Sequence, residues 1–467
     1  MRIRFTAWQR MSRSLARSTL ALGVGLLGLV LSSARSSGEA EGVANPAISA
    51  SDTQSPDAAP FVGNIELKSR VDAPGKLAIA GERLHGALLR RFYIAHEYRT
   101  VWDNHPLAAN RLRNVILRAA DHGLDPDLFH SSALGERSTM LSAVDRDLLL
   151  SDAFLSYADA LSRGAMPIEN RADDEDLTPE PVDVVAVLDT AMADPEPARI
   201  IEALAPSSPE YRTMRRAYAE YRAIAAANQA VRSARGSAEK MAMAEKRALL
   251  IAINLERLRW LPRHMPPDRV VVGELDKQTP EFQSKIDSIL FNPPWNIPRS
   301  IAQKEILPKL AADPDYLSSH HMRFRRNGAV QQEAGPYSAL GRLKFEMNDR
   351  YDVYLHDTPT KSLFQAAARM MSHGCVRVEN PRTLAVLLLG QPVETIDKRI
   401  AAVHTARQEL PAAIPIFIVY QTAYVEPDGS IQFRSDPYER DDEIWRYLVH
   451  PVALPVAQES AVGQRKG

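Results

Sequence analysis

The stretch Met370-Met371-Ser372-His373-Gly374-Cys375-Val376-Arg377-Val378 contains the single cysteine of the 467-residue chain. One thiol cannot form an intramolecular disulfide, and a structural zinc site needs about four ligands, mostly Cys and His. Cys375 is therefore either a small buried apolar residue, the commoner role of a free cysteine, or a nucleophile. Gly374 lets the backbone approach a reacting carbonyl, and Arg377 lies on the same side of a short strand as Cys375, where it can receive a carboxylate.

A histidine upstream can supply the base that such a thiol needs. His356 ends an apolar, β-rich run and precedes Cys375 by 19 positions. A free thiol is only a few per cent ionised at neutral pH, so a neighbouring imidazole is its usual activator. An apolar helix, 384–389, is predicted after Pro381. We therefore expect Cys375 at a turn close to a helix N-terminus, where backbone N–H groups favour a thiolate and a developing oxyanion.

Each of these residues has a plainer interpretation when it is taken alone. A histidine at a strand end is more often a surface histidine than a base, and Arg377 alone is more often a surface cation. The combination of a turn cysteine, a glycine before it, an arginine after it and His356 upstream favours an acyl-transfer site.

Length and composition indicate a globular, multidomain protein. The 467 residues predict two or three domains, and 45% hydrophobic residues are enough for real cores. The 57 basic and 58 acidic residues nearly cancel, so no net field attracts a polyanion. Nucleic acid is therefore not an expected partner.

The N-terminus has the pattern of an export signal. Five arginines precede an apolar run, 20–31, and Ser32-Ser33-Ala34 offers the small residues of a cleavage site. Because a membrane span needs about 20 apolar residues, residues 1–35 are predicted to be a signal peptide, with an uncleaved membrane anchor as the alternative. Either form places the rest of the chain outside the cytoplasm. Residues 36–75, rich in Ser, Ala, Gly and Pro, are predicted to be a disordered linker.

Residues 76–225 have helical periodicity and predict an all-helical scaffold domain. Apolar side chains recur there at steps of three and four, and helix stops are expected at Gly123 and Gly164. The clearest apolar series are Leu84, Leu88, Phe92 and Ala95; Leu112, Val115, Ile116 and Ala119; and Phe154, Tyr157 and Leu161. A charged, Ala-rich stretch, 226–248, predicts a helical connector.

The second half mixes short strands with turns. Strands are predicted at 270–273, 351–356 and 414–420, and the last is expected to pair with 430–433 across a Pro-Asp-Gly turn. Residues 426–467 are interpreted as a C-terminal hairpin and tail.

An insertion, 279–312, is predicted to be a helix, a Pro/Trp-rich loop and a second helix. Thr279-Pro280-Glu281 resembles a helix start, with Phe282, Ile286 and Ile289 on one face. The three prolines of 292–298 exclude a helix there, and 300–310 predicts the second helix. Such an insertion could form a lid over a site on the sheet.

The motifs together resemble the L,D-transpeptidase catalytic domain. Its signature is a histidine, a spacer of under twenty residues, and Ser/Thr-His-Gly-Cys followed one residue later by Arg or Asn. Here these stand as Tyr354-Leu355-His356-Asp357-Thr358-Pro359 and 372–378. The large periplasmic subfamily with a helical scaffold domain is most similar. Further shared patches are Leu255-Glu256-Arg257, Trp260-Leu261-Pro262, Thr279-Pro280, 292–298, 339–345, Phe92-Tyr93 and His122-Gly123-Leu124.

The resemblance implies an α+β fold, with an N-terminal all-helical scaffold domain and a β-sandwich-like catalytic domain at 249–425. It implies that Cys375 attacks the carbonyl of the third residue of a peptidoglycan tetrapeptide stem, expelling the terminal D-alanine and leaving a thioester. His356 would take the thiol proton and pass it to the departing amine. An amine of a neighbouring stem would then accept the acyl group. No metal or organic cofactor is implied, and carbapenem β-lactams are expected inhibitors.

The resemblance also assigns supporting roles. The candidates for an oxyanion hole are His373, Gly374 and the N–H group of Cys375. The imidazole must hold one tautomer, and either Asp357 or a backbone carbonyl could accept its second hydrogen bond. The candidate substrate-binding residues are Tyr354, Arg377, Ser372 and Trp295.

The chain also departs from the family pattern. A peptidoglycan-binding repeat is missing between the scaffold and residue 249, and only eight residues, 263–270, separate Pro262 from Val271, where relatives have a strand hairpin. The stretch 324–335 is short, and Ser338 stands where relatives often have asparagine. We therefore expect an open strand edge with unpaired backbone groups. Two alternatives follow: a catalytically weakened envelope scaffold that binds peptidoglycan or a partner, and a cysteine hydrolase that cuts stems.

Overall fold

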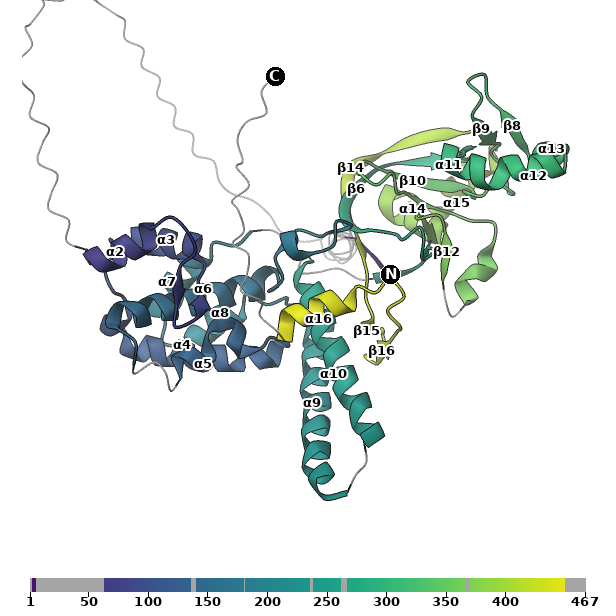
Figure 1. Ribbon diagram of the computed structural model, residues 1–467. Helices are drawn as coiled ribbons and strands as arrows, with labels where there is room; N and C mark the ends of the chain where they lie inside the picture. The colour runs from purple at the N-terminus through teal and green to yellow at the C-terminus, as the bar shows by residue number, and fades with distance from the viewer. Residues whose placement is uncertain are drawn as a thin grey trace, which may run out of the picture.

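The computed structural model describes residues 2–5, 63–135, 140–179, 181–235, 238–261, 267–366 and 369–449. The apolar run 20–31, most of the predicted linker and the residues after Val449 lie outside this description. Figure 1 shows a helical body at one end, a sheet domain at the other, and a long helical hairpin with α16 (Asp441–Val449) between them. Within the described residues, no helix is long and apolar enough to cross a membrane.

The helical body surrounds one long central helix. Its elements are α2 (Ile65–Asp72), β2 (Ala78–Ile79), β3 (Glu82–Arg83), α3 (Gly86–Ala95), η1 (Trp102–Asn104), α4 (Pro106–Leu117), η2 (Arg118–His122), η3 (Pro126–Phe129), α5 (Ser131–Leu134), α6 (Ala143–Arg163), η5 (Ile168–Asn170), β4 (Glu175–Asp176), α7 (Val184–Ala193) and α8 (Pro197–Glu202). The Ser142 hydroxyl caps α6 by accepting from Asp145 N–H, and Gly164 ends it with a φ of 94°. The helices predicted from apolar spacing are confirmed.

One part of the predicted linker is helical. Helix α2 occupies Ile65–Asp72, where Leu67 and Val71 are buried four positions apart. Asn64 caps its first turn by accepting from Leu67 N–H. The prediction of a disordered segment through residue 75 was therefore wrong for these residues, because a single i, i+4 apolar pair is a weak signal in a polar stretch.

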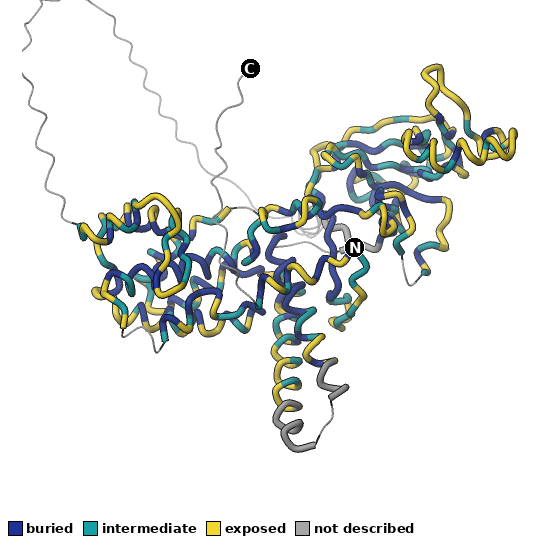
Figure 2. The backbone as a smooth tube through the Cα atoms, in the orientation of Figure 1, coloured by how far each residue is buried: buried dark blue, intermediate teal, exposed yellow. Residues whose placement is uncertain are grey.

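Two long helices join the halves. α9 (Pro209–Arg235) and α10 (Ala238–Arg259) form a hairpin that projects from the molecule, and burial is concentrated at its base (Figure 2). The predicted connector is therefore helical but divided between two antiparallel helices. The last turns of α10 run through the core, where the Glu256–Arg259 ion pair is completely buried.

A mixed sheet forms the core of the second half. Its strand order is β1-β14-β6-β10-β11-β13-β5-β12, with β4 of the helical body pairing parallel to β6. The strands are β1 (Arg2–Phe5), β5 (Pro267–Gly273), β6 (Glu281–Phe291), β10 (Leu343–Met347), β11 (Leu355–His356), β12 (Met370–Ser372), β13 (Val376–Val378) and β14 (Ala406–Val419). Helices α14 (Pro381–Leu389) and α15 (Val393–Ala401) contribute Leu384, Leu388 and Ile396 to its core. The α+β class is confirmed.

The helix predicted after Thr279 is instead strand β6. Phe282, Ile286 and Ile289 recur at steps of four and three, which mimics a helical face, yet all three are buried in the sheet core. Strand β6 pairs with β14 on one side and β10 on the other, so tertiary pairing overrode the local pattern.

The rest of the predicted insertion, 279–312, forms a small cap with its own core together with residues up to Gln332, beyond the predicted bound. β7 (Trp295–Asn296), β8 (Met322–Phe324) and β9 (Val330–Gln332) form a three-stranded sheet, covered by α11 (Arg299–Ile301), η6 (Ala302–Ile306), α12 (Leu307–Ala312) and α13 (Tyr316–Ser319). Ile297, Ile306 and Val330 are among its buried residues. The predicted second helix is confirmed, but the cap is a sheet with helices and not a helix-loop-helix unit.

The strand edge that we expected to be open is paired. Strand β1 lies antiparallel to both β14 and β5, with Arg2 opposite Val419 and Arg269. A gap one strand wide between two strands offers hydrogen bonds on both sides, which accounts for this pairing. Residues Arg2–Phe5, interpreted from the sequence as part of a leader, thus occupy the position of the missing strand.

The C-terminal segment also differs from its prediction. The turn at 427–429 is present, but β16 (Ile431–Phe433) pairs with β15 (Ala423–Val425) and not with β14. Residues 441–449 form α16, which packs against α10 and places Ile444 and Leu448 in the core of the helical body. The segment interpreted as a tail therefore ties the two halves together.

Candidate active site

Four predicted site residues lie on one face of two neighbouring strands. Strands β11 and β13 are parallel, with His356 opposite Arg377. Leu355 and Val376, opposite each other, are completely buried in the sheet core. Because side chains alternate along a strand, Tyr354, His356, Cys375 and Arg377 point to the other face. The ring centroids of Tyr354 and His356 lie 5.7 Å apart, in agreement with this arrangement.

The backbone sets the tautomer of His356. Its Nδ1 lies 2.5 Å from the carbonyl oxygen of Asp357, which can only accept, so Nδ1 carries the proton and Nε2 is left as the base. Burial, reinforced by Arg377, lowers the His356 pKa to about 4. The ring is therefore neutral at physiological pH.

The carboxylate of Asp357 points elsewhere. It accepts from Arg342 N–H at 2.8 Å and from Lys361 Nζ at 2.6 Å. The sequence left open whether Asp357 or a backbone carbonyl orients the imidazole. The orienting group is the backbone carbonyl of Asp357, while its side chain secures the adjoining turn.

Cys375 lies at the predicted turn, between β12 and β13, but not at a helix N-terminus. Strand β13 separates it from α14, which begins only at Pro381. Burial raises the pKa of the thiol, and hydrogen bonding from the Tyr354 backbone and hydroxyl offsets this only in part. The expectation that the local dipole favours a thiolate was therefore wrong, because desolvation dominates.

The turn before Cys375 is held by the Ser372 side chain. The Ser372 hydroxyl donates to the Cys375 carbonyl at 2.5 Å and accepts from Gly374 N–H at 3.2 Å. Gly374 has a φ of 106°, a conformation that L side chains rarely adopt. Both residues thus shape the loop that carries the thiol.

The cap contacts this turn at His373, and it also contacts Lys277 after β5 and Tyr354 beside β11. His373 Nε2 lies 2.6 Å from Glu305 of η6, and Lys277 Nζ lies 3.2 Å from the same carboxylate. The Trp295 side chain on β7 forms a hydrogen bond with the Tyr354 hydroxyl, whose pKa burial raises. The predicted site residues His373 and Trp295 therefore link the cap to the strand face that carries Cys375.

Arg377 carries an unused donor. Its Nε is buried and has no hydrogen-bond partner among the described residues. Burial lowers its pKa, and the charge of a thiolate at Cys375 or of Glu274 opposes this shift. A half-buried guanidinium with a free donor beside a nucleophile is a suitable binding position for a carboxylate.

Sequence reasoning missed two residues of this region. Lys344 on β10 lies opposite His356 in the register, and its Nζ is 4.2 Å from the centre of the Tyr354 ring. The alternation of β10, with Leu343 and Phe345 buried, could have pointed to it. Thr279, whose hydroxyl donates to Gly374, was noted only as a helix start and as part of a shared Thr-Pro patch, so its contact with Gly374 was not anticipated.

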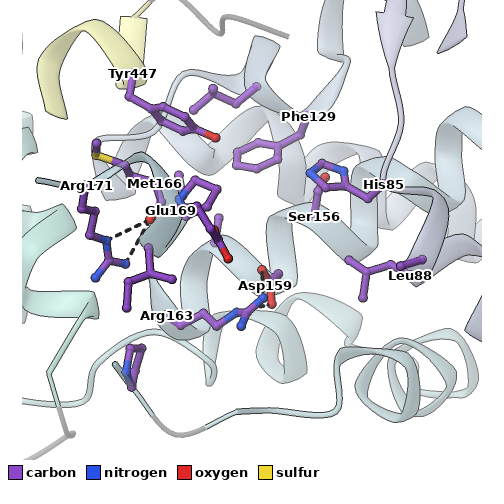
Figure 3. Close-up of a pocket in the computed structure, with 18 of the residues that line it drawn as sticks. His85, Leu88, Phe129, Ser156, Asp159, Arg163, Met166, Glu169, Arg171 and Tyr447 are labelled. Atoms are coloured by element: carbon purple, nitrogen blue, oxygen red, sulfur yellow. Dashed lines mark hydrogen bonds and ion pairs between the residues drawn. The ribbon is translucent and has the colours of Figure 1, made fainter. Parts of the chain in front are cut away.

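A separate cavity lies in the helical body and does not include this site. Its volume is about 340 Å³, and its lining comes largely from α3, α6 and the 164–179 segment, with Tyr447 of α16 at one side (Figure 3). Cys375, His356 and Arg377 are not among its lining residues. The cavity therefore has no part in the chemistry of the cysteine.

Comparisons with known proteins agree with the division into two halves. A scaffold domain matches residues 87–217, and an L,D-transpeptidase catalytic domain matches residues 245–395. The chain carries an L,D-transpeptidase catalytic domain behind a scaffold domain. A Haemophilus influenzae protein named "Putative L,D-transpeptidase" is 35% identical over 199 residues, which cover 38% of this chain.

The match leaves parts of both proteins uncompared. The chain spans 40% of the length of the Haemophilus influenzae relative. The matched L,D-transpeptidase region includes His356 and Cys375 but ends at residue 395, before β14 and the C-terminal segment. Any role of those later residues must therefore be argued from the structure itself.

Proposed function

We propose that this protein is a peptidoglycan L,D-transpeptidase of the cell envelope, exported to the periplasm, which cross-links stem peptides through a thioester at Cys375. The observation that carries this proposal is the hydrogen bond from His356 Nδ1 to the Asp357 carbonyl. It leaves Nε2 unprotonated on the same strand face as the only thiol of the chain. The match to an L,D-transpeptidase catalytic domain supports the reaction class.

The proposed reaction has two halves. His356 Nε2 takes the thiol proton as Cys375 Sγ attacks the carbonyl carbon of the third stem residue, and the bond to the terminal D-alanine then breaks. The imidazolium returns the proton to the departing amine, leaving a thioester. In the second half, an amine of another stem attacks the thioester, His356 takes its proton, and the thiol is regenerated.

The neighbouring side chains fit a peptide substrate. Arg377 presents its free donor to a stem carboxylate, and the Tyr354 hydroxyl forms hydrogen bonds with both Cys375 and Trp295 of the cap. Ser372 was expected to contact substrate. Because its hydroxyl already bonds Cys375 O and Gly374 N–H, we propose a positioning role for it instead.

The thioester provides the direct test. Full-length protein incubated with tetrapeptide muropeptides is expected to gain the mass of the stem lacking D-alanine, at Cys375, followed by a cross-linked dimer. A carbapenem is expected to form an adduct at the same residue. Cys375→Ser should show neither product by mass spectrometry. Folded parent protein that forms no adduct with either reagent contradicts the proposal.

The alternatives predict other products. Free tripeptide without a cross-linked dimer would identify a hydrolase. The weakened-scaffold alternative rested on the missing parts of the catalytic sandwich. Strand β1 fills the open strand edge, but β1 belongs to the predicted leader, so cleavage of residues 1–35 would expose that edge again. Sacculus binding by a parent that turns nothing over would favour that alternative.

The pH dependence of acylation follows from the His356 pKa. The imidazole must be neutral to act as a base, so the rate is expected to fall only as the pH drops through about 4, the lowered pKa of His356, and not near the ordinary 6.5. Because burial raises the Cys375 pKa above 9.0, iodoacetamide alkylation should still increase above pH 9. Stopped-time mass spectrometry of the adduct across pH 3.5–9.5 measures the first effect. An acidic limb between pH 6 and 7 would show that His356 titrates normally.

A further inference from the structure

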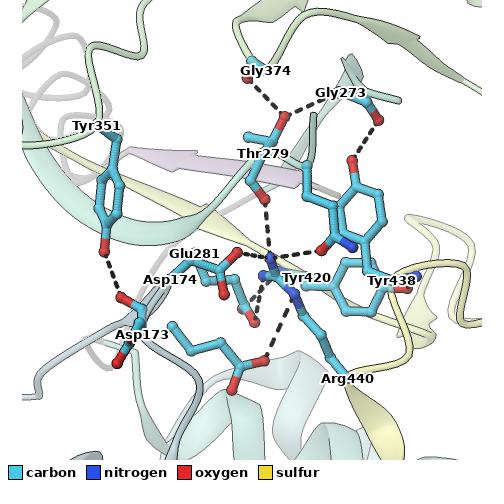
Figure 4. Close-up of polar contacts among 12 residues, drawn as sticks. Asp173, Asp174, Gly273, Thr279, Glu281, Tyr351, Gly374, Tyr420, Tyr438 and Arg440 are labelled. Carbon is cyan, nitrogen blue, oxygen red and sulfur yellow. Dashed lines mark hydrogen bonds and ion pairs between the residues drawn. The ribbon is translucent and has the colours of Figure 1, made fainter. Parts of the chain in front are cut away.

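A buried threonine holds the peptide group that carries the Cys375 N–H. Thr279 is completely buried in the turn after β5. Its hydroxyl donates to the Gly374 carbonyl at 2.8 Å and accepts from Gly273 N–H at 2.9 Å, so both of its roles are used (Figure 4). The Gly374 carbonyl and the Cys375 N–H belong to one planar peptide group.

Because that peptide group is planar, the contact of Thr279 with the Gly374 carbonyl fixes the direction of the Cys375 N–H. In a trans peptide the C=O and N–H bonds point in opposite directions, so anchoring the Gly374 carbonyl on Thr279 aims the Cys375 N–H away from it. Gly374 N–H is already bonded to Ser372, whereas no hydrogen bond to the Cys375 N–H is formed within the described part of the chain. The N–H of a nucleophile is a recurrent oxyanion donor in acyl transfer.

We propose that Thr279 is a positioning residue that aims the Cys375 N–H at the developing oxyanion, and that Arg440, beyond the matched catalytic domain, holds Thr279 in place. This inference rests on the proposed acyl transfer at Cys375. It assigns roles in catalysis to a turn after β5 and to the C-terminal segment, neither of which touches the substrate.

The turn that contains Thr279 is closely packed. A Cβ on Gly273 would lie 1.9 Å from the Lys277 carbonyl oxygen, a distance that no side chain can tolerate. A Cβ on Gly374 would lie 3.7 Å from the same oxygen, so the turn packs directly on the cysteine loop. Gly273 thus allows the close approach within the turn, whereas a Cβ at Gly374 would make only an ordinary contact, so the glycine there is needed for its positive φ.

Arg440 braces this turn from the C-terminal side. Its guanidinium, with only 4% of the side chain exposed, bonds the Asp174 carboxylate of the helical body and lies 3.4 Å from the Thr279 carbonyl oxygen. Its neighbour Tyr438 donates its hydroxyl to the Gly273 carbonyl at 2.6 Å. Figure 4 shows Thr279 between these contacts and Gly374. Asp174 of the helical body and the C-terminal residues Arg440 and Tyr438 therefore all help to hold the turn that orients the Cys375 N–H.

The test removes the Thr279 hydroxyl while keeping its shape. Thr279→Val should lower kcat for thioester formation about 10–100-fold with KM changed less than about 3-fold, since one misaimed oxyanion donor costs up to about 10²–10³. Iodoacetamide alkylation, which needs no oxyanion donor, should be unchanged. Thr279→Ser should restore most of kcat. Thr422→Val, a buried threonine that accepts from Asn254 instead, is the matched control and should keep the parent kcat.

The possible outcomes distinguish failure of the positioning role of Thr279 from failure of the proposed acyl transfer at Cys375. A folded Thr279→Val protein with kcat within about 2-fold of the parent overturns the positioning role. If Thr279→Val does not fold, Tyr438→Phe replaces it, and a kcat loss of about 3–10-fold at constant KM is expected; an unchanged kcat overturns the inference. If the parent forms no thioester, the proposed function fails. The crystal structure of Thr279→Val then decides, because a Gly374–Cys375 peptide in its original orientation refutes the anchor.

Discussion

Replacing His356 by glutamine is expected to lower kcat/KM for stem acylation by about 10²–10⁴-fold, the usual contribution of a positioned general base. Burial raises the Cys375 pKa, so the thiol is not ionised in advance and depends on a base at the moment of attack. Glutamine can keep the contact with the Asp357 carbonyl through its amide N–H but cannot accept a proton. The loss should therefore appear with little change in folding.

The control is a histidine outside the site. His404 lies in the exposed turn before β14, with its ring near the Ala402 carbonyl, and His404→Gln should keep the parent rate. Initial rates of adduct formation at pH 7, with circular dichroism of each variant, measure the effect. Raising the pH to 9.5 should recover part of the His356→Gln rate, because more of the thiol ionises without a base. A His356→Gln enzyme within about 3-fold of the parent would exclude His356 as the base.

Replacing Arg440 by methionine is expected to lower the free energy of unfolding by about 3–5 kcal/mol, because it removes one of the two guanidinium groups, those of Arg440 and Arg257, that stabilise the buried carboxylates of Glu175 and Glu281. Arg440 Nη1 lies 3.8 Å from Glu281 and its Nε lies 4.0 Å from Glu175. Burial and the charge of Glu281 raise the Glu175 pKa to about 8. The Glu175 carboxyl group is therefore largely protonated at pH 6 and ionises only as the pH approaches about 8.

The pH dependence of this loss has a defined sign. A carboxyl group whose folded pKa is raised binds more protons in the folded state, so stability falls as pH rises from about 4.5 towards about 8. Arg440→Met should increase the loss of stability between pH 6 and pH 8.5, because the removed cation stabilised the ionised carboxylates. Adding Glu281→Gln to Arg440→Met should recover part of the lost stability. Urea unfolding at pH 6 and pH 8.5 measures both.

The matched control is Arg434→Met. Arg434 is exposed and its guanidinium contacts the Tyr424 hydroxyl and ring, so its loss should cost no more than about 0.5–1 kcal/mol. Equal urea midpoints for Arg440→Met and the parent would show that the buried cluster is not held by this guanidinium. A loss that is the same at pH 6 and pH 8.5 would show that Glu175 does not titrate in this range.

The sequence predicted the elements whose pattern is local. The helices of the body carry apolar residues at helical spacing and end at Gly123 and Gly164, and both signals arise within one segment. The strand that carries Phe282, Ile286 and Ile289 was misassigned because the spacing of three residues fits a helix, while two neighbouring strands decide otherwise. Because the paired strands lie far apart in the sequence, a local pattern cannot predict their pairing.

The candidate site was likewise predicted in part from local sequence and determined in part only by the folded chain. A lone cysteine, the Ser-His-Gly before it and a histidine 19 positions earlier were enough to propose the nucleophile and its base. The group that orients His356, the raised pKa of the thiol and the contact of the cap with His373 depend on backbone direction and burial. Those are properties of the folded chain and not of any short segment.

The sequence alone thus determined the reaction class that we propose and the α+β division of this protein, because a short motif and apolar periodicity are written in adjacent residues. Only the tertiary structure brought Thr279 to the Gly374 carbonyl, Arg440 to the Thr279 carbonyl and Asp174 to Arg440. These residues are separated by up to 266 positions, and a buried polar network forms only where distant segments must satisfy each other's hydrogen bonds.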